Sequence, residues 1–278
     1  MITCYSPRAR QNKKTCLKEV FGTKEWAEYS ENIINGCIHN CKYCYSKEMA
    51  IRFKRTTVSS WVDETLRSNV WNKKITLKSG RIMFPSSHDI HPMHLEPIVA
   101  FLRRVLEVGN DVLIVTKPHF ECINKICSTF LEYRSQILFR FTIGSINNEA
   151  LNFWEPGAPC FEERLTCLEH AYLKGYETSV SCEPALDNDV SALIIKLLPF
   201  ITNSIWIGKP NMFLHRLKIN GHSDEETLIK ATGLLEQLSD QFFIQLYREY
   251  QDNSVIKWKE SVKKLIGLNI PVVAGLDI

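Results

Sequence analysis

The sequence lacks any long apolar segment and any strong excess of charge. None of its stretches reaches the roughly 18 consecutive apolar residues that a membrane-spanning helix needs. Its 34 lysines and arginines nearly balance 31 aspartates and glutamates, so the net charge is only +3. The pI near 8.3 stays below the value of about 9 that is typical of a dedicated nucleic-acid-binding domain. The first ten residues also lack the apolar region of a signal peptide, so we expect a cytoplasmic protein with no membrane partner.

The composition is that of an ordinary globular protein. Hydrophobic residues make up 45% and charged residues 23% of the 278 residues, which excludes wholesale disorder. The length allows either two domains or one α/β barrel of roughly 200 to 250 residues.

Short apolar runs alternate with segments of helical period along most of the chain. The expected strands are residues 32–36, 80–85, 111–116, 137–143, 177–182, 204–207 and 271–274. The expected helices are residues 95–108, 120–132, 161–174, 190–200 and 225–250. Strands separated by helices indicate βαβ units and a parallel sheet that helices cover. The sequence therefore predicts an α/β fold, an open partial (β/α)6-type barrel with its helices outside.

No Pro-, Gly- or Ser-rich linker and no repeat divides the chain. We expect residues 1–30 to form a basic N-terminal arm and residues 31–278 to form a single barrel domain with a C-terminal helical extension. The basic side chains of the arm are Arg8, Arg10, Lys13, Lys14 and Lys18.

Ten cysteines are many for a compartment in which thiols stay reduced. Cys37, Cys41 and Cys44 form a C-x3-C-x2-C motif after the first expected strand. The other seven, which contain no C-x2-C pair, are Cys4, Cys16, Cys122, Cys127, Cys160, Cys167 and Cys182. This pattern predicts a single clustered metal site.

Thiolates are suitable ligands for zinc and for iron–sulfur clusters. His39 would complete a Cys3His zinc site, although four ligands within eight residues can hardly surround a metal tetrahedrally. A ferredoxin-type cluster needs a fourth cysteine, which this motif lacks. Three cysteines would leave one iron of a cluster open to another ligand.

The active site of a (β/α) barrel lies at the carboxyl ends of its strands. Polar residues follow the expected strands at residues 37–44, 86–89, 116–117, 142–145, 182–183 and 208–211. We expect them to line a shared pocket, with Glu183 as an acid at the substrate. Polar residues also simply begin loops.

The cysteine motif, followed by the aromatic Tyr45, resembles that of the radical S-adenosylmethionine (SAM) superfamily. The resemblance implies a radical SAM partial barrel and a 4Fe–4S cluster held by Cys37, Cys41 and Cys44. It further implies that SAM binds the open iron and is cleaved to a 5′-deoxyadenosyl radical, which abstracts hydrogen from a substrate. The protein would bind and orient the cofactor and exclude water. An electron donor such as flavodoxin or ferredoxin would be a partner.

Further landmarks are similar to those of the spore photoproduct lyase and photolyase-like group. In order, they are residues 40–45, 84–89, 115–117, 140–143, 153–159 leading to Arg164, and 174–176. This resemblance implies that Lys117 pairs with the carboxylate of SAM, that Thr142 contacts SAM, and that Tyr43 lies beside the adenine. The candidate cofactor-binding residues are Tyr43, Lys117, Thr142, Ser145 and Arg164. The candidate catalytic residues are Cys182, Glu183 and Tyr43.

One landmark departs from the pattern of the lyase group. A cysteine after the second strand of the lyase is thought to return hydrogen to the product radical, and Ser86 takes the best-matching position here. An alcohol O–H is a poor hydrogen-atom donor, so we expect the superfamily chemistry without repair of the thymine spore lesion. Cys182 is a candidate replacement thiol, although a free cysteine is often only a small buried hydrophobe. The substrate stays open, with a nucleic acid or a nucleotide among the candidates.

Two rival functions stay open. One is a zinc-stabilised, non-catalytic module that binds nucleic acid through the basic arm, and the other is a cluster protein that only transfers or senses electrons. Arg52, Lys54 and Arg55 could grip phosphates, as could the arm. The spaced set His88, His91 and His94 is interpreted as capping or solvated residues, or else as a second metal site.

Overall fold

The expected alternation of strands and helices builds an open parallel sheet. We describe residues 18–277 of a computed structural model. The strands are β1 (Tyr29–Ser30), β2 (Ile34–Asn35), β3 (Thr65–Leu66), β4 (Ile82–Phe84), β5 (Val112–Thr116), β6 (Ile137–Thr142), β7 (Glu177–Cys182), β8 (Ile205–Ile207) and β9 (Ile256–Trp258). Seven of them form one sheet in the order β1-β4-β5-β6-β7-β8-β9, and every neighbouring pair is parallel. Strands β2 and β3 form a separate antiparallel ribbon.

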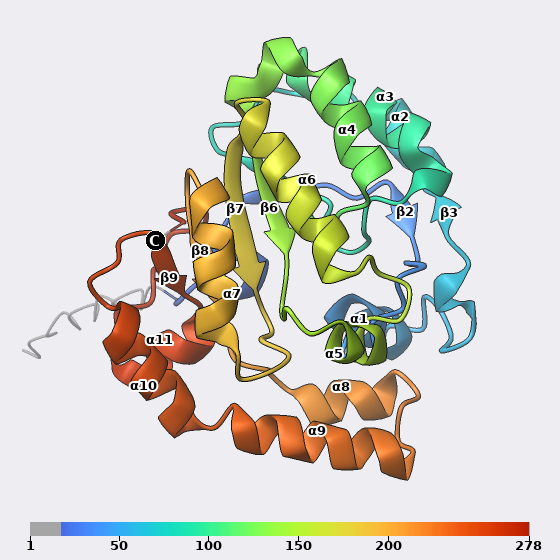
Figure 1. The fold of residues 1–278 in the computed structure, drawn as a ribbon. Coiled ribbons are helices and arrows are strands. Elements are labelled where there is room, and N and C mark those ends of the chain that lie inside the picture. The colour runs from blue at the N-terminus through green and yellow to red at the C-terminus, as the bar shows by residue number, and fades with distance from the viewer. Residues whose placement is uncertain (1–17, 278) are drawn as a thin grey trace, which may run out of the picture.

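Helices follow most of these strands. The α-helices are α1 (Tyr45–Arg52), α2 (Ser68–Asn72), α3 (Leu95–Leu106), α4 (Phe120–Thr129), α5 (Asn148–Trp154), α6 (Phe161–Leu173), α7 (Val190–Leu197), α8 (Phe213–Ile219), α9 (Glu225–Gln237), α10 (Asp240–Tyr250) and α11 (Glu260–Ile266). Short 3-10 helices are η1 (Gly22–Glu25), η2 (Ser60–Val62), η3 (Pro92–His94), η4 (Leu131–Gln136) and η5 (Leu198–Phe200). Figure 1 shows α1, α5 and α8 gathered at the end of the sheet towards which the β6 and β7 arrows point. The partial (β/α) barrel predicted from the sequence is confirmed.

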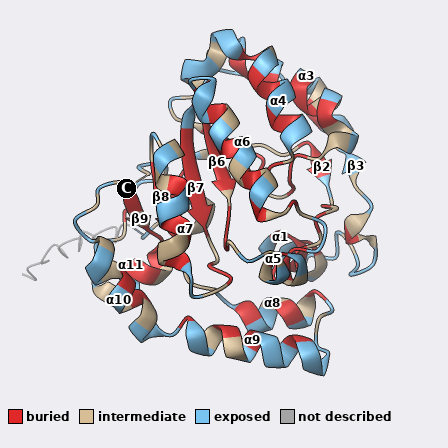
Figure 2. Cartoon of the chain, viewed as in Figure 1, coloured by how far each residue is buried: buried red, intermediate tan, exposed pale blue. Residues whose placement is uncertain are grey.

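Each strand of the barrel has an outer and an inner face, because successive side chains of a strand point in opposite directions. The outer side chains, such as Ile114, Phe139 and Val180, belong to the main core under the helices. The inner side chains Leu113 and Leu138 belong to a much smaller cluster inside the barrel. Figure 2 shows the strands as buried and the helices as buried on one side and exposed on the other.

The two edges of the sheet differ from the prediction. Residues 32–36 do not form the first barrel strand, because the edge strand is β1 and this segment contributes β2 to the ribbon. Residues 271–274 form no strand, and β9 closes the other edge. The sequence pattern did not predict β9, because Lys257 interrupts the apolar run between the outer residues Ile256 and Trp258.

The long helix expected at residues 225–250 is two helices. Helix α9 ends at Gln237, and α10 begins after Ser239. The Ser239 hydroxyl accepts a hydrogen bond from the backbone N–H of Phe242 (3.4 Å), which is the arrangement of a helix N-cap.

Part of the expected N-terminal arm belongs to the barrel. Helix η1 and strand β1 lie within residues 1–30, and Trp26 packs inside the barrel against Trp206. Residues 1–17, which carry Arg8, Arg10, Lys13 and Lys14, lie outside the described residues. The predicted boundary at residue 30 between an N-terminal arm and the barrel domain stays a prediction. Among residues 18–277, no helix combines the length and apolar character that crossing a bilayer requires.

Candidate active site at the carboxyl end of the sheet

A cavity of about 600 Å³ opens at the carboxyl ends of the strands. Seven of the predicted site residues line it, namely Cys37, Cys41, Tyr43, Cys44, Lys117, Thr142 and Glu183. Three predicted residues, Ser145, Arg164 and Cys182, do not. The fold thus gathers residues that are up to 146 positions apart in the sequence, from Cys37 to Glu183.

The cysteine loop is held by tight local contacts. Gly36 has a φ of +86°, and a Cβ at this position would lie 2.6 Å from the carbonyl oxygen of Trp61, so only glycine fits there. Asn40 takes a left-handed conformation (φ +47°), and its Oδ1 accepts a hydrogen bond from the Lys47 ammonium (2.8 Å). Cys44 is the N-cap of α1. These contacts turn the loop so that three thiols reach one cavity.

The three thiols form a soft donor set. Burial is the main cause that raises the pKa of Cys37, Cys41 and Cys44. Cys41 and Cys44 further raise the pKa of Cys37, and Cys44 further raises that of Cys41. A bound metal deprotonates its thiol ligands, so these groups fit a cationic centre. Among residues 18–277, no fourth cysteine lines the cavity. The donor set therefore fits an iron–sulfur cluster that is held by three protein ligands.

The turn after α5 supports the cysteine loop through backbone contacts. A Cβ on Gly157 would lie 2.5 Å from the carbonyl oxygen of Ile38 and 2.9 Å from the Cα of His39. The Gly157 N–H donates to the His39 carbonyl (3.1 Å), and the Lys42 N–H donates to the Trp154 carbonyl (2.9 Å). This close backbone approach explains why glycine occupies position 157.

Arg164 and Glu155 connect this turn to Tyr43. Arg164 is fully buried, and its Nη2 lies 2.6 Å from Glu155 Oε2. Its Nη1 donates to the Thr142 carbonyl (3.2 Å), and the Tyr43 hydroxyl donates to Glu155. Burial and the Glu155 carboxylate raise the pKa of Tyr43. Arg164 thus lies behind the cavity wall, where it positions Tyr43 and Thr142 through their neighbours.

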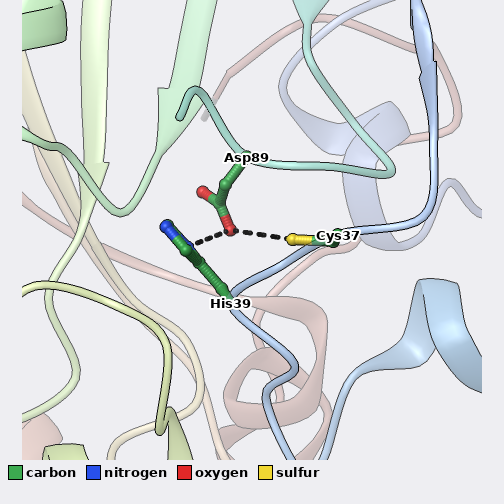
Figure 3. A group of neighbouring side chains, drawn as sticks. All are labelled: Cys37, His39 and Asp89. Atoms are coloured by element: carbon green, nitrogen blue, oxygen red, sulfur yellow. Dashed lines mark hydrogen bonds and ion pairs between the residues drawn. The ribbon is translucent and has the colours of Figure 1, made fainter. Parts of the chain in front are cut away.

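Asp89 is the centre of the charged network beside the cysteines, which Figure 3 shows together with Cys37 and His39. Its Oδ2 lies 3.0 Å from His39 Nδ1, 3.6 Å from Lys117 Nζ and 3.9 Å from Cys37 Sγ. Its Oδ1 accepts from the Thr116 hydroxyl (2.8 Å) and the Lys117 N–H (2.7 Å). Asp89 therefore does not cap the following 3-10 helix, whose N-cap is His91.

Lys117 and Asp89 hold each other in their charged forms. Burial alone would raise the pKa of Asp89, but the charges of Lys117 and His39 keep it well below its usual range. Burial alone would lower the pKa of Lys117, but Asp89, with smaller contributions from Cys41, Tyr43 and Glu155, keeps it well above its usual range. A permanent ammonium group therefore faces the cavity beside the thiols.

The spaced histidines have structural partners. His91 caps η3, since its Nδ1 accepts from the Met93 N–H (3.2 Å). His88 is buried and bonds to the Ile33 N–H (3.2 Å) and the Asp89 carbonyl (2.9 Å). His94 Nε2 lies 3.3 Å from Glu64. The capping interpretation is confirmed for His91.

A second wall has buried charges around Lys259, and sequence reasoning missed Lys259, Glu25 and Glu260. Lys259 is fully buried and lies 2.7 Å from Glu25, 3.5 Å from Glu183 and 3.8 Å from Glu260. Burial raises the pKa of Glu183, while Lys259 opposes that shift. Glu183 and Glu260 line the cavity, whereas Glu25 lies behind them. Lys259 directly follows β9, so recognising that strand would have revealed it.

No family profile matches the chain. An uncharacterized protein, ORF301, of Acidianus two-tailed virus is 24% identical in an alignment of 268 positions, which covers 88% of this chain and 87% of the viral protein. Solved structures of two variants of spore photoproduct lyase superpose with TM-scores of 0.51 and 0.50, each at 16% identity over 76% of this chain.

The chain therefore has the fold of spore photoproduct lyase. The alignment covers 66% of each lyase chain, so the protein spans about two thirds of the lyase structures that it matches. The resemblance predicted from the cysteine motif and the later landmarks is confirmed at the level of the fold.

Two of the predicted residues point away from the cavity in this lyase-like barrel. Cys182 belongs to the core under the helices together with Val180, and its thiol donates to the Gly144 carbonyl (3.9 Å). Ser181, of opposite parity in β7, lines the cavity instead. Ser145 is buried, donates to Asp187 and accepts from the Asn147 N–H (2.7 Å). The period-2 pattern of β7 could have assigned Cys182 to the core.

Proposed function

We propose that the protein is a radical SAM enzyme whose Cys37, Cys41 and Cys44 hold a 4Fe–4S cluster. The observation that carries this proposal is that the buried Cys37 and Cys41 and the half-buried Cys44, and no other described cysteine, line one cavity at the mouth of a lyase-like barrel. When bound, the cluster and SAM would supply one-electron cleavage of the cofactor and a 5′-deoxyadenosyl radical that abstracts hydrogen from a substrate.

The protein's own residues would bind and orient SAM and would exclude water from the cavity. Lys117 offers an ammonium group to the carboxylate of SAM, and a charge-assisted hydrogen bond of this kind is stronger than a neutral one. Asp89 holds Lys117 from behind at 3.6 Å, so the ammonium is fixed before any cofactor arrives. Thr142 lines the same cavity and is the proposed neutral contact to SAM.

Tyr43 is proposed to pack beside the adenine of SAM. Its ring stacks on Phe213, with ring centroids 5.6 Å apart, and its hydroxyl is engaged by Glu155. The engaged hydroxyl favours a packing role for Tyr43 over a direct catalytic one. Arg164 is proposed to support cofactor binding indirectly, through Glu155 and the Thr142 carbonyl.

Glu183 is the proposed acid at the substrate, because it lines the same cavity as the cysteines. Cys182 is not proposed as a hydrogen-atom donor, since its thiol faces the core. Ser86 lines the cavity and accepts from the Asn32 amide (2.8 Å). A nucleic acid or a nucleotide stays the candidate substrate, with flavodoxin or ferredoxin as electron donor and the cytoplasm as location.

Single replacement of the three cysteines tests the proposal. After anaerobic reconstitution, the wild-type protein should hold an iron–sulfur chromophore and should form 5′-deoxyadenosine from SAM with a chemical reductant. C37A, C41A and C44A should each lose the chromophore and the product. C160A, which removes a partly exposed cysteine outside the cavity, should keep both. Product formation by C41A at the wild-type rate would overturn the assignment.

A second candidate rests on the group Cys37, His39 and Asp89, whose ligand atoms all lie within 4.8 Å of one another. A single zinc ion there would make the cysteine loop a structural site, as in a non-catalytic binding module. The variants separate the two candidates, because a mononuclear site should survive C41A and C44A but should be lost in H39A and D89N. The metal content of these four variants, measured by elemental analysis, decides between them.

A further inference from the structure

A second cavity of about 750 Å³ adjoins the first. It lies between the β2–β3 ribbon and α1, which are neighbours in Figure 1, and it shares six lining residues with the first cavity. The shared residues are Thr23, Tyr45, Ser46, Trp61, Ser86 and Ser87. A ligand that reaches from one cavity into the other would pass these side chains.

Two arginines line the second cavity without an acidic partner. Arg67 is half-buried, its Nε donates to the Asn35 amide oxygen (2.7 Å), and it forms no ion pair within residues 18–277. Arg55 is exposed and likewise forms no ion pair in this part of the chain. Asp63 is the one acidic residue of the lining, and it is paired with neither arginine. Two uncompensated positive charges therefore face the same cavity.

The arginines affect each other electrostatically. Burial lowers the pKa of Arg67, and the like charge of Arg55 lowers it further. Two cations that repel each other at a half-buried position gain stability from an anion between them. No acid of the described chain performs this role.

Neutral donors without acceptors lie where the two cavities meet. The Trp61 side chain is only 3% exposed, and its indole Nε1 has no hydrogen-bond partner among the described residues. The Ser87 hydroxyl is also buried without a partner in the described part of the chain. A buried donor that lacks an acceptor destabilises the folded protein. The junction is therefore incomplete without a ligand that brings acceptor oxygens.

We propose that the second cavity binds a phosphate group of the substrate, with Arg67 and Arg55 as its cationic partners and Trp61 and Ser87 as neutral donors. The inference rests on the proposed function, because it assigns the phosphate to the molecule whose reacting part enters the first cavity. Phosphate fits this set better than a carboxylate does. Its oxygens can accept from a planar guanidinium in a bidentate manner and still accept from other donors.

Calorimetric titration with inorganic pyrophosphate tests the proposal. The full chain is titrated both before reconstitution and after reconstitution with iron, sulfide and SAM. We expect binding in both forms, with R67Q weakening it about tenfold or more, as the loss of a charge-assisted hydrogen bond implies. R67K keeps the charge but loses the planar fork and should fall between R67Q and the wild type.

R52Q is the matched control. Arg52 lies on α1 near the second cavity but does not line it, and it pairs with Glu48 at 2.9 Å. R52Q should therefore keep pyrophosphate affinity within about twofold of the wild type, since the lost charge lies outside the cavity and is already paired with Glu48. Equal weakening by R52Q and R67Q would reduce the site to diffuse positive charge and overturn the proposal.

A carboxylate probe and the cofactor assay complete the test. Succinate should bind at least about tenfold more weakly than pyrophosphate, and equal affinity would contradict a phosphate site. Formation of 5′-deoxyadenosine without any pyrophosphate binding would refute this inference and leave the radical SAM function intact. Pyrophosphate binding without any cofactor cleavage would refute the radical SAM function and leave the phosphate site intact.

Discussion

The first cavity has two charged and buried walls, one around Lys259 and one formed by the cysteine loop. We call the first wall complete, because its charges have partners within the protein, and the second incomplete, because its thiols have few such partners among the described residues. On one wall, Lys259 contacts three carboxylates and lies 4.2 Å above the ring of Trp26. On the other, three thiols have raised pKa values, and Cys37 has only a distant contact with Asp89 at 3.9 Å. The comparison teaches that buried charge alone does not identify a ligand site. What identifies it is a donor set that the protein itself leaves unsatisfied.

The largest effect on stability is expected from breaking the complete wall. K259M should destabilise the protein by about 3–5 kcal/mol, because it leaves buried carboxylates without their cation. Chemical denaturation of purified protein measures this loss. K264M removes an exposed lysine of the same helix and should change stability by less than about 1 kcal/mol. Iron content per folded molecule should stay at the wild-type level in K259M, and its loss would show that the two walls are not independent.

A smaller effect on stability is expected from disturbing the turn at Gly157, which contacts the cysteine loop of the incomplete wall. In G157A the new methyl group would collide with the backbone of Ile38 and His39, so we expect a loss of about 1–3 kcal/mol and reduced iron occupancy. Thermal unfolding and iron analysis check both effects. G233A is the opposite case, since a Cβ there meets nothing within 4 Å and Gly233 lies inside α9. It should stabilise the protein by roughly 0.5–1 kcal/mol, and a stabilised G157A would contradict the supporting role of the turn.

The last prediction concerns pH, because the stability that the wall around Lys259 provides changes by a small amount with each pH unit. Burial and the hydrogen bond to Glu260 raise the pKa of Glu25 from 4.5 to about 8. Between these values the unfolded chain loses the Glu25 proton while the folded chain keeps it, so this group makes stability fall as the pH rises. The slope contributed by one such group is at most about 1.4 kcal/mol per pH unit.

E25Q removes this titration while it retains a side chain of the same size. Its melting temperature should therefore fall less between pH 5 and pH 8 than that of the wild type. Parallel melting curves for the two proteins would contradict the raised pKa of Glu25.

The central part of the fold could be predicted because its signals are local. Strand β5 is a continuous apolar or β-branched run, β6 is such a run apart from Arg140, and β7 alternates polar residues with Thr178, Val180 and Cys182. Helices α3, α4 and α6 carry apolar residues at helical spacing. The edge strands β1 and β9 have two and three residues, and their neighbours in the sheet define them as strands. Residues 32–36 look like a strand locally, but the nearest free partner for them is β3.

The residues of the candidate site likewise fall into two groups, those that could be predicted from local sequence and those that could not. Cys37, Cys41 and Cys44 are close in sequence, so their shared site could be inferred from spacing. Asp89 and Glu155 were visible only as members of motifs, and no pattern indicated that one would hold Lys117 and the other Tyr43. Cys182 was predicted as a catalytic residue because it lies at the carboxyl end of a strand, but its side chain faces the core.

Spacing and chemical type within a few residues were enough to predict a three-thiol ligand set, a partial (β/α) barrel, and the strand ends as the place of chemistry. These properties depend on neighbours along the chain and on the fixed periods of helices and strands. Which buried charges meet, which donors are left without acceptors, and which side chains face inward depended on packing between distant segments. Those contacts form only when the sheet closes, because a pair such as Lys259 and Glu25 has no interaction along the extended chain.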